Sequence, residues 1–305
     1  MVLSQFCTDD AVNQLFDYSK CVVDQICGCE ERPKKLKEIQ YLIFAGMISY
    51  YGFEQIDNIT RAFKENQFFY TKEKMLDYLS KQNISQQTLS SIDNDTYAFF
   101  NQTFFYKKST NEYFVKGKIV VSDDNNAAPD NLIEYTVHEI NHAVNSVKKR
   151  ITSVGNGFII RTGVYSKDFR DGSRKNKLLE ESFNVLQSAE IMDHILNFTN
   201  YKINDKEIKY VLDSINYAAN KKRRGLGYAH VTSLVRPLYE NSNFNIKLKK
   251  NRMDGEIKII SDDFDSIIGK GSFDRLGSQI DEFYYGTLVS GKKANVLIKE
   301  YVSRR

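Results

Sequence analysis

The sequence has no tryptophan and only three prolines among its 305 residues. Hydrophobic residues make up 41% of the chain, so a collagen-like or disordered protein is excluded. Twenty phenylalanines and 19 tyrosines are left to supply the large side chains of the core. The length is sufficient for one large domain or two modest ones.

Long hydrophobic runs and a strong excess of charge are also missing. The most apolar early run, Tyr41 to Tyr51, is far shorter than the roughly 20 residues that a membrane helix needs. The first residues show neither the basic nor the apolar segment of a signal peptide, so we expect a cytoplasmic protein with no membrane partner. A net charge of +4 is too small to indicate a nucleic-acid partner.

Four cysteines lie within the first 29 residues, at positions Cys7, Cys21, Cys27 and Cys29. Their spacing matches no common zinc pattern, and in a cytosolic protein we expect reduced thiols. A small metal or redox cluster is the alternative.

Helical patterns dominate the first part of the chain. Apolar residues recur at three- and four-residue spacing in the segments Ala11–Ile26, Leu36–Tyr51 and Lys72–Leu79. We therefore predict a helical N-terminal region over residues 1–110.

The pattern changes after residue 110. Two short β-rich runs, 113–115 and 118–121, flank Gly117 and predict strand. Asp130 stands at the N-cap position of a strongly periodic segment, which predicts a helix from Asn131 to Lys149.

A hairpin and further helices are predicted beyond this segment. The runs 151–154 and 158–165 surround a Gly-Asn-Gly turn, which is typical of a β-hairpin. A second long helix follows from Lys177 to Asn197, and the rest reads as mostly helical. The expected fold is α+β and mostly helical, with a small antiparallel or mixed sheet. Its second domain, residues 111–305, divides into 111–150, 151–169 and 177–305.

The central helix contains the motif His138-Glu139-Ile140-Asn141-His142. Histidines four positions apart lie on one face of a helix and can chelate a single ion. The adjacent Glu139 can then take a proton from a water molecule activated by the metal. With only four histidines in the chain, chance produces roughly 0.007 such motifs or fewer.

The apolar residues of this helix give independent support. A stripe at 4-3-4-3 spacing predicts the face that packs on the core: Ile133, Val137, Ile140, Val144 and Val147. His138 and His142 fall roughly 100–180° from it, which leaves them free to line a cleft. The alternative is a surface helix whose polar face happens to carry two histidines.

Two histidines need a third protein ligand to form a catalytic zinc site. The extended metzincin motif is excluded, because Asn145 and Lys148 occupy its glycine and histidine positions. A glutamate on a following helix is the alternative, and the second long helix offers two candidates for the third ligand, Glu180 and Glu181.

The order of strand, His-Glu-x-x-His helix and glutamate-bearing helix resembles the gluzincin class of zinc metallopeptidases. The segment Leu178-Leu179-Glu180-Glu181-Ser182-Phe183-Asn184-Val185 is similar to the L-N-E-G-[FL]-[ST]-E segment of a bacterial branch. This resemblance covers residues 113–191 and implies a zincin-like catalytic core with Glu181 as the third Zn²⁺ ligand. Glu180 and Ser182 stand where Asn and Gly are usual, and Val185 replaces an acidic residue. For Glu180 we expect a solvated helix face.

The resemblance also implies a function, the zinc-dependent hydrolysis of a peptide or protein substrate. Glu139 would be the general base, and Tyr228 or His230 would donate a hydrogen bond to the oxyanion. The alternative is a catalytically inactive zinc-binding protein that acts as an interaction module, although such a protein needs no general base. The basic clusters 221–224 and 247–252 are expected to be solvated.

Overall fold

The computed structural model describes residues 8–27, 34–64, 66–69, 72–81, 98–107, 112–122, 129–145, 151–154, 157–168, 170–221, 228–254 and 256–305. These residues are mostly helical and form two small sheets, which confirms the predicted α+β class. The chain packs as two compact units, residues 1–143 with 188–223 and residues 144–187 with 224–305. The boundary predicted near residue 110 lies outside the described residues and stays a prediction.

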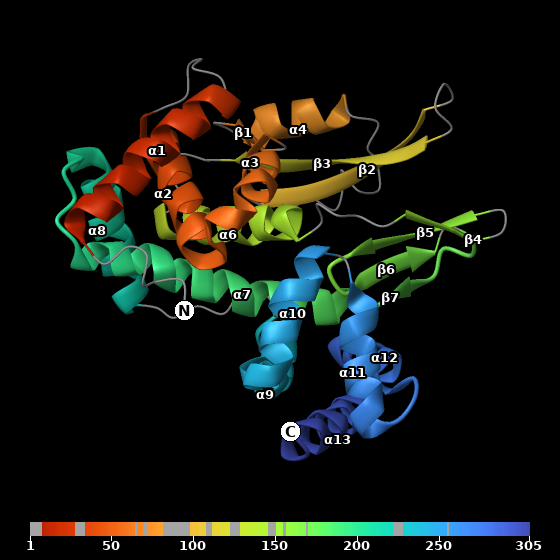
Figure 1. Ribbon diagram of the computed structural model, residues 1–305. Helices are drawn as coiled ribbons and strands as arrows, with labels where there is room; N and C mark the ends of the chain where they lie inside the picture. Colours follow the sequence, from red (N-terminus) through yellow and green to blue (C-terminus); the bar gives the residue numbers. More distant parts are fainter. Residues whose placement is uncertain are drawn as a thin grey trace. The chain divides into compact units, whose positions relative to one another are not determined.

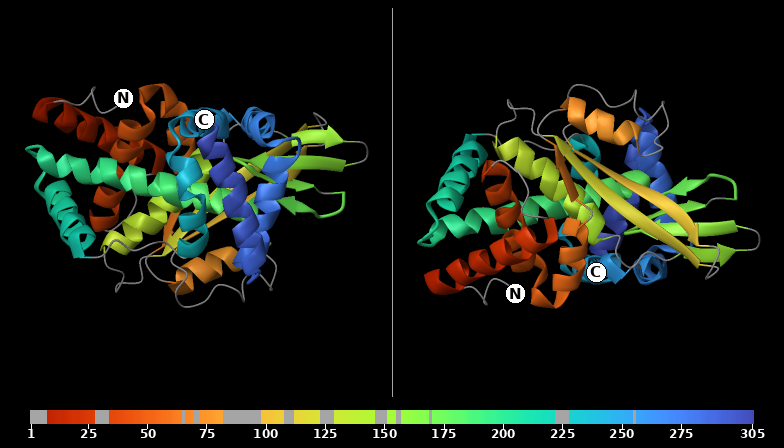
Figure 2. Two further views of the ribbon diagram at one scale, coloured as in Figure 1. Left: turned by 90° about the horizontal axis from the view of Figure 1, so that it is seen from below. Right: turned by 90° about the horizontal axis from the view of Figure 1, so that it is seen from above.

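Helices make up most of the first unit (Figures 1 and 2). They are α1 (Asp9–Cys27), α2 (Lys34–Tyr51), α3 (Ile56–Lys64), α4 (Lys72–Ser80), α6 (Pro129–Val144) and α8 (Lys206–Lys221), with the short 3₁₀ turns η2 (Phe53–Gln55) and η3 (Phe198–Asn200). α1 packs on α2 and α3, and α2 also packs on α8. α2 is buried continuously from Glu38 to Tyr51, as expected for a helix with apolar residues on all sides. The three helices predicted in this region are confirmed.

The first sheet contains β1 (Asn66–Phe69), β2 (Ala98–Lys107) and β3 (Glu112–Ser122) in the order β1-β3-β2. β1 is parallel to β3, and β2 is antiparallel to it, with Phe104 opposite Val115. β3 unites the two predicted runs on either side of Gly117. The N-terminal region, which we predicted to be mainly helical, also contains the strands β1 and β2, which were not predicted. The paired phenylalanines of β2 do not alternate with polar residues, so its sequence lacks the period of a half-buried strand.

The second sheet is an antiparallel meander in the second unit (Figure 2). Its strands are β4 (Ile151–Val154), β5 (Gly157–Thr162), β6 (Tyr165–Asp168) and β7 (Arg174–Lys175). The predicted hairpin is confirmed as the pair β4 and β5, while most of its turn lies outside the described residues. The second predicted run is interrupted at Gly163, whose φ of 54° lies in the left-handed region that favours glycine.

The second unit is otherwise helical. α7 (Lys177–Asn197) has the predicted bounds and passes from this unit into the first. It is followed by α9 (Ala229–Glu240), α10 (Ser242–Asp254), α11 (Ile257–Ile268), α12 (Ser272–Tyr284) and α13 (Leu288–Ser303). None of the described helices has both the length and the apolar character needed to cross a membrane.

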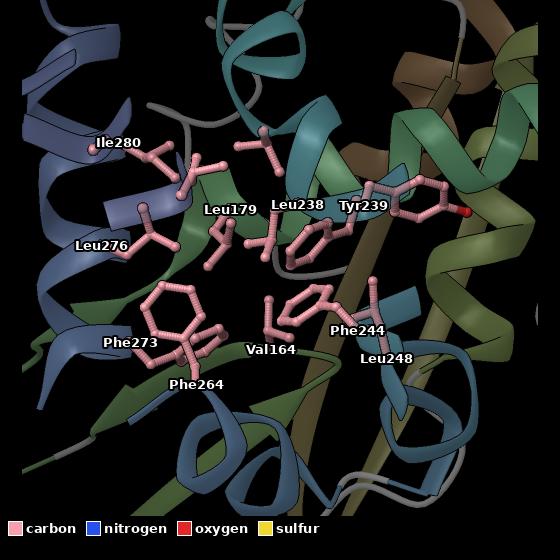
Figure 3. Close-up of a cluster of buried hydrophobic side chains, with 14 of the residues drawn as sticks. Val164, Leu179, Leu238, Tyr239, Phe244, Leu248, Phe264, Phe273, Leu276 and Ile280 are labelled. Carbon is pink, nitrogen blue, oxygen red and sulfur yellow. The ribbon is translucent and has the colours of Figure 1, made fainter. Parts of the chain in front are cut away.

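A continuous apolar core joins the helices of the second unit to the turn between β5 and β6 (Figure 3). Leu179 of α7 faces Leu238 of α9 there, and Phe264 of α11 stacks on Tyr301 of α13 with ring centroids 4.8 Å apart. Val164, in the turn between β5 and β6, is completely buried in the same cluster. This packing buries one side of the first half of α7 against the other helices of the unit.

Candidate metal centre

Three side chains predicted as metal ligands lie close together. His138 and His142 on α6 and Glu181 on α7 each offer one ligand atom, and these atoms lie within 4.8 Å of one another. The two imidazole rings have centroids 4.8 Å apart and are almost perpendicular. Two imidazoles and one carboxylate are a donor set that can hold a divalent metal ion.

The core-facing stripe of α6 is as predicted. Ile133, Val137, Ile140 and Val144 are completely buried, whereas Val147 lies outside the described residues. The helix begins at Pro129, a favoured first residue, so Asp130 lies inside the first turn rather than at the N-cap. Its described part ends before the predicted Lys149.

The opposite face of α6 is more enclosed than its sequence predicts. His138 and His142 are only 8% and 7% exposed, and the polar residues Thr136 and Asn141 on the flanks of the helix are buried as well. Glu139 and Glu181 are half-buried. The candidate centre therefore combines two buried imidazoles with two carboxylates that keep some access to solvent.

Hydrogen bonds from the end of α2 hold both ligand-bearing helices. Tyr51 donates its hydroxyl proton to the side-chain oxygen of Asn141, inside the motif of α6. Tyr50 donates to Glu190 of α7 at 2.6 Å, and the Ser49 hydroxyl lies 3.0 Å from Nδ1 of His194. α2 thus provides a common support for α6 and for the second half of α7. Sequence reasoning missed these contacts because nothing in the sequence of α2 marks its partners.

A glycine allows α2 and α7 to approach closely. A Cβ atom at Gly46 would lie 2.3 Å from Cγ1 of Ile195, so a larger residue there would force the side chain of Ile195 to move. Both residues belong to the first unit, in which α2 is almost completely buried.

The solvated face expected for Glu180 was wrong. Glu180 is 3% exposed and forms an ion pair with Arg252, which is 1% exposed. One carboxylate oxygen also accepts the backbone N–H of Val164 at 2.7 Å. The basic cluster 247–252 was also expected to be solvated, and this was wrong for Arg252. A buried guanidinium requires a charged partner, and Arg252 finds one in Glu180.

Val185 stands where the resemblance implies an acidic residue that orients a histidine ligand. It is buried, with 7% of its surface exposed.

Tyr228 and His230 lie at the start of α9. Tyr228 is half-buried, with its ring centroid 5.8 Å from that of Tyr284. His230 is exposed and stacks on the same tyrosine at 5.5 Å. A role for either side chain in oxyanion stabilisation stays a prediction.

Comparison with known proteins gives no independent assignment. No family model, no curated protein and no solved structure matches the chain. The motif of α6 and the grouping of His138, His142 and Glu181 are therefore the features that indicate a function.

Proposed function

We propose that the protein is a zinc-dependent metallopeptidase with a zincin-like core of the gluzincin type. The observation that supports it is the grouping of His138, His142 and Glu181 beside Glu139. A tetrahedral zinc ion with bonds of about 2.1 Å separates its ligand atoms by about 3.4 Å. The donor set fits the ion, because two of its atoms are imidazole nitrogens and the third is a carboxylate oxygen, and small side-chain rotations bring atoms within 4.8 Å of one another to this separation.

The proposed chemistry assigns one task to each side chain. Bound zinc supplies Lewis acidity and lowers the pKa of a coordinated water to about 7. Glu139 follows His138 on the same helix and is half-buried, so it can accept a proton from water and pass it to the leaving amine. Tyr228 or His230 would donate a hydrogen bond to the developing oxyanion.

The low exposure of the two histidines favours one alternative, a zinc-binding protein without activity. Structural zinc sites are closed, whereas catalytic sites keep one position open. A general base would have no task in such a site, so the behaviour of Glu139 separates the two functions.

Metal content tests the proposed ligands. We expect about one zinc per chain in the purified protein, measured by mass spectrometry of the metal, and loss of this zinc in His142→Ala. His230→Ala is the matched control, because it removes a histidine outside the triad and should retain the metal. Equal zinc content in His142→Ala and the wild-type protein would show that the site is wrong.

Peptide hydrolysis tests the general base. Glu139→Gln should bind as much zinc as the wild type but hydrolyse a diverse peptide library about 10²–10⁴-fold more slowly. Undiminished hydrolysis in this variant would remove Glu139 from the mechanism. A zinc-loaded wild-type protein that cleaves no member of the library would favour the inactive alternative.

A further inference from the structure

A buried network surrounds Arg252 of α10. Its guanidinium donates hydrogen bonds to three side chains of α7, namely Glu180, Asn184 and Gln187. Its Nε lies 3.1 Å from one oxygen of Glu180, and its Nη2 lies 3.1 Å from Oδ1 of Asn184. All three acceptors are less than 4% exposed, so the contacts exclude water.

The spacing of the acceptors fixes the orientation of α7. Positions 180, 184 and 187 follow each other at i, i+4 and i+7, which places them on one face of the helix. Glu181 is the next residue after Glu180, and its side chain is therefore directed about 100° further around the axis. A rotation of α7 would break the contacts to Arg252 and redirect Glu181 at the same time.

The turn between β5 and β6 clamps Glu180 from a second direction. The backbone N–H of Val164 donates to Oε2 of Glu180 at 2.7 Å. A Cβ atom at Gly163 would lie 2.2 Å from the same oxygen, so the backbone can approach the carboxylate only at a glycine. Glu180 therefore has little freedom to change its position.

The same network reaches the end of α6. Oε1 of Gln187 accepts from Arg252 and also from Nδ2 of Asn145, at 3.2 Å in the second case. Asn145 comes three residues after His142 in the chain and is 1% exposed. Arg252 is thus connected to the segments that carry the second histidine and the glutamate of the candidate centre.

We propose that Arg252 is a positioning residue for the metal centre, which holds α7 so that Glu181 is directed at the ion. This inference rests on the proposed function. Replacement of a buried ion pair by apolar residues is often neutral or stabilising, so the pair is not explained by stability alone. Groups that orient metal ligands typically change metal affinity by about 10–100-fold when they are removed.

The test compares metal affinity with folding in the full-length protein. The double variant Glu180→Leu/Arg252→Met removes both charges and leaves no unpaired carboxylate in the interior. We expect its melting temperature without metal to stay close to that of the wild type, while its zinc dissociation constant rises about 10–100-fold. The visible spectrum of the cobalt-loaded variant should also change, because it reports ligand geometry, which a merely structural role would leave unaltered.

Lys247→Met is the matched control. Lys247 also lies on α10 and forms an ion pair, but its partner is Asp263 of α11. Zinc affinity and the cobalt spectrum should both be unchanged in this variant. A loss of affinity equal to that of the double variant would overturn the inference, since any disturbance of α10 would then suffice.

The possible results separate this inference from the proposed function. A folded double variant with wild-type zinc affinity and cobalt spectrum overturns the positioning role and leaves the proposed function intact. If the double variant does not fold, Arg252→Lys is the deciding variant, because it keeps the positive charge but loses the planar guanidinium. Weaker zinc binding in Arg252→Lys supports the inference, and unchanged zinc binding overturns it. If the wild-type protein binds no zinc, the proposed function fails and the positioning role fails with it.

Discussion

Gly163 shows how strongly one residue can be determined by its surroundings. Its φ of 54° favours glycine, and a Cβ atom there would lie 2.2 Å from the carboxylate of Glu180. Gly163→Ala should therefore lower the free energy of unfolding by about 2–4 kcal/mol, from backbone strain and from displacement of a buried ion pair. Urea denaturation followed by circular dichroism measures this change.

Gly172→Ala is the control for backbone strain alone. Gly172 has a φ of 74°, but no atom lies within 4 Å of the position of its Cβ. Its substitution should cost about 1 kcal/mol. If both variants lose the same stability, the close approach of Gly163 to Glu180 has no energetic consequence.

Single residues differ in how far the sequence reveals them. His138 and His142 are found by their spacing, because a helix converts a separation of four residues into a shared face. The pairing of Glu180 with Arg252 spans 72 residues, and each side chain alone looks like part of a solvated face. Only tertiary packing shows that both charges are buried.

At the scale of elements, the start of α7 depends on a residue of another helix. The N–H of Leu178 donates to Oδ1 of Asp281 on α12 at 3.0 Å, which satisfies one of the unpaired donors of the first turn. Asp281→Ala should reduce the free energy of unfolding by about 0.5–2 kcal/mol, the usual effect of losing a helix cap.

The effect of Asp281→Ala should depend on pH. Burial raises the pKa of Asp281, although the hydrogen bond from Leu178 opposes this shift. The folded state then binds a proton more readily than the unfolded state, so the contribution of this carboxyl falls as the pH rises through the raised pKa. The stability difference between wild type and Asp281→Ala should be larger at about pH 4 than at about pH 8, and the opposite trend in urea denaturation would contradict it.

Strong local signals determined which elements were predicted. α7 has the predicted bounds, and α1 and α2 extend one or two residues beyond theirs, because long periodic segments bury one face or all faces. β2 was missed because its doubled phenylalanines give no alternation, and β7 because it has two residues. The elements that were missed are thus strands, whose formation depends on pairing with neighbouring strands.

The whole molecule has an organisation that its sequence does not display. The division into units falls after residues 143, 187 and 223. The first two boundaries lie in the last turn of α6 and within α7, where no linker or change of composition occurs. Compactness is a property of contacts between segments far apart in the chain, and a single sequence contains no direct record of them. The α+β class was predictable because it needs only the types of the elements.

Zinc binding should stabilise the folded chain as a whole if the candidate centre is as proposed. Glu181 on α7 comes together with His138 and His142 on α6 only on folding, so the unfolded chain offers no equivalent three-ligand site. Free zinc at about 100 times its dissociation constant should raise the free energy of unfolding by about 2.7 kcal/mol. Calorimetry should show that zinc raises the melting temperature of the wild type and leaves the melting temperature of His142→Ala unchanged.

Magnesium is the control ion, because it prefers oxygen ligands and should stabilise neither protein. Equal stabilisation of both proteins by zinc would place the bound ion elsewhere, because the binding free energy would then not depend on the second imidazole of α6.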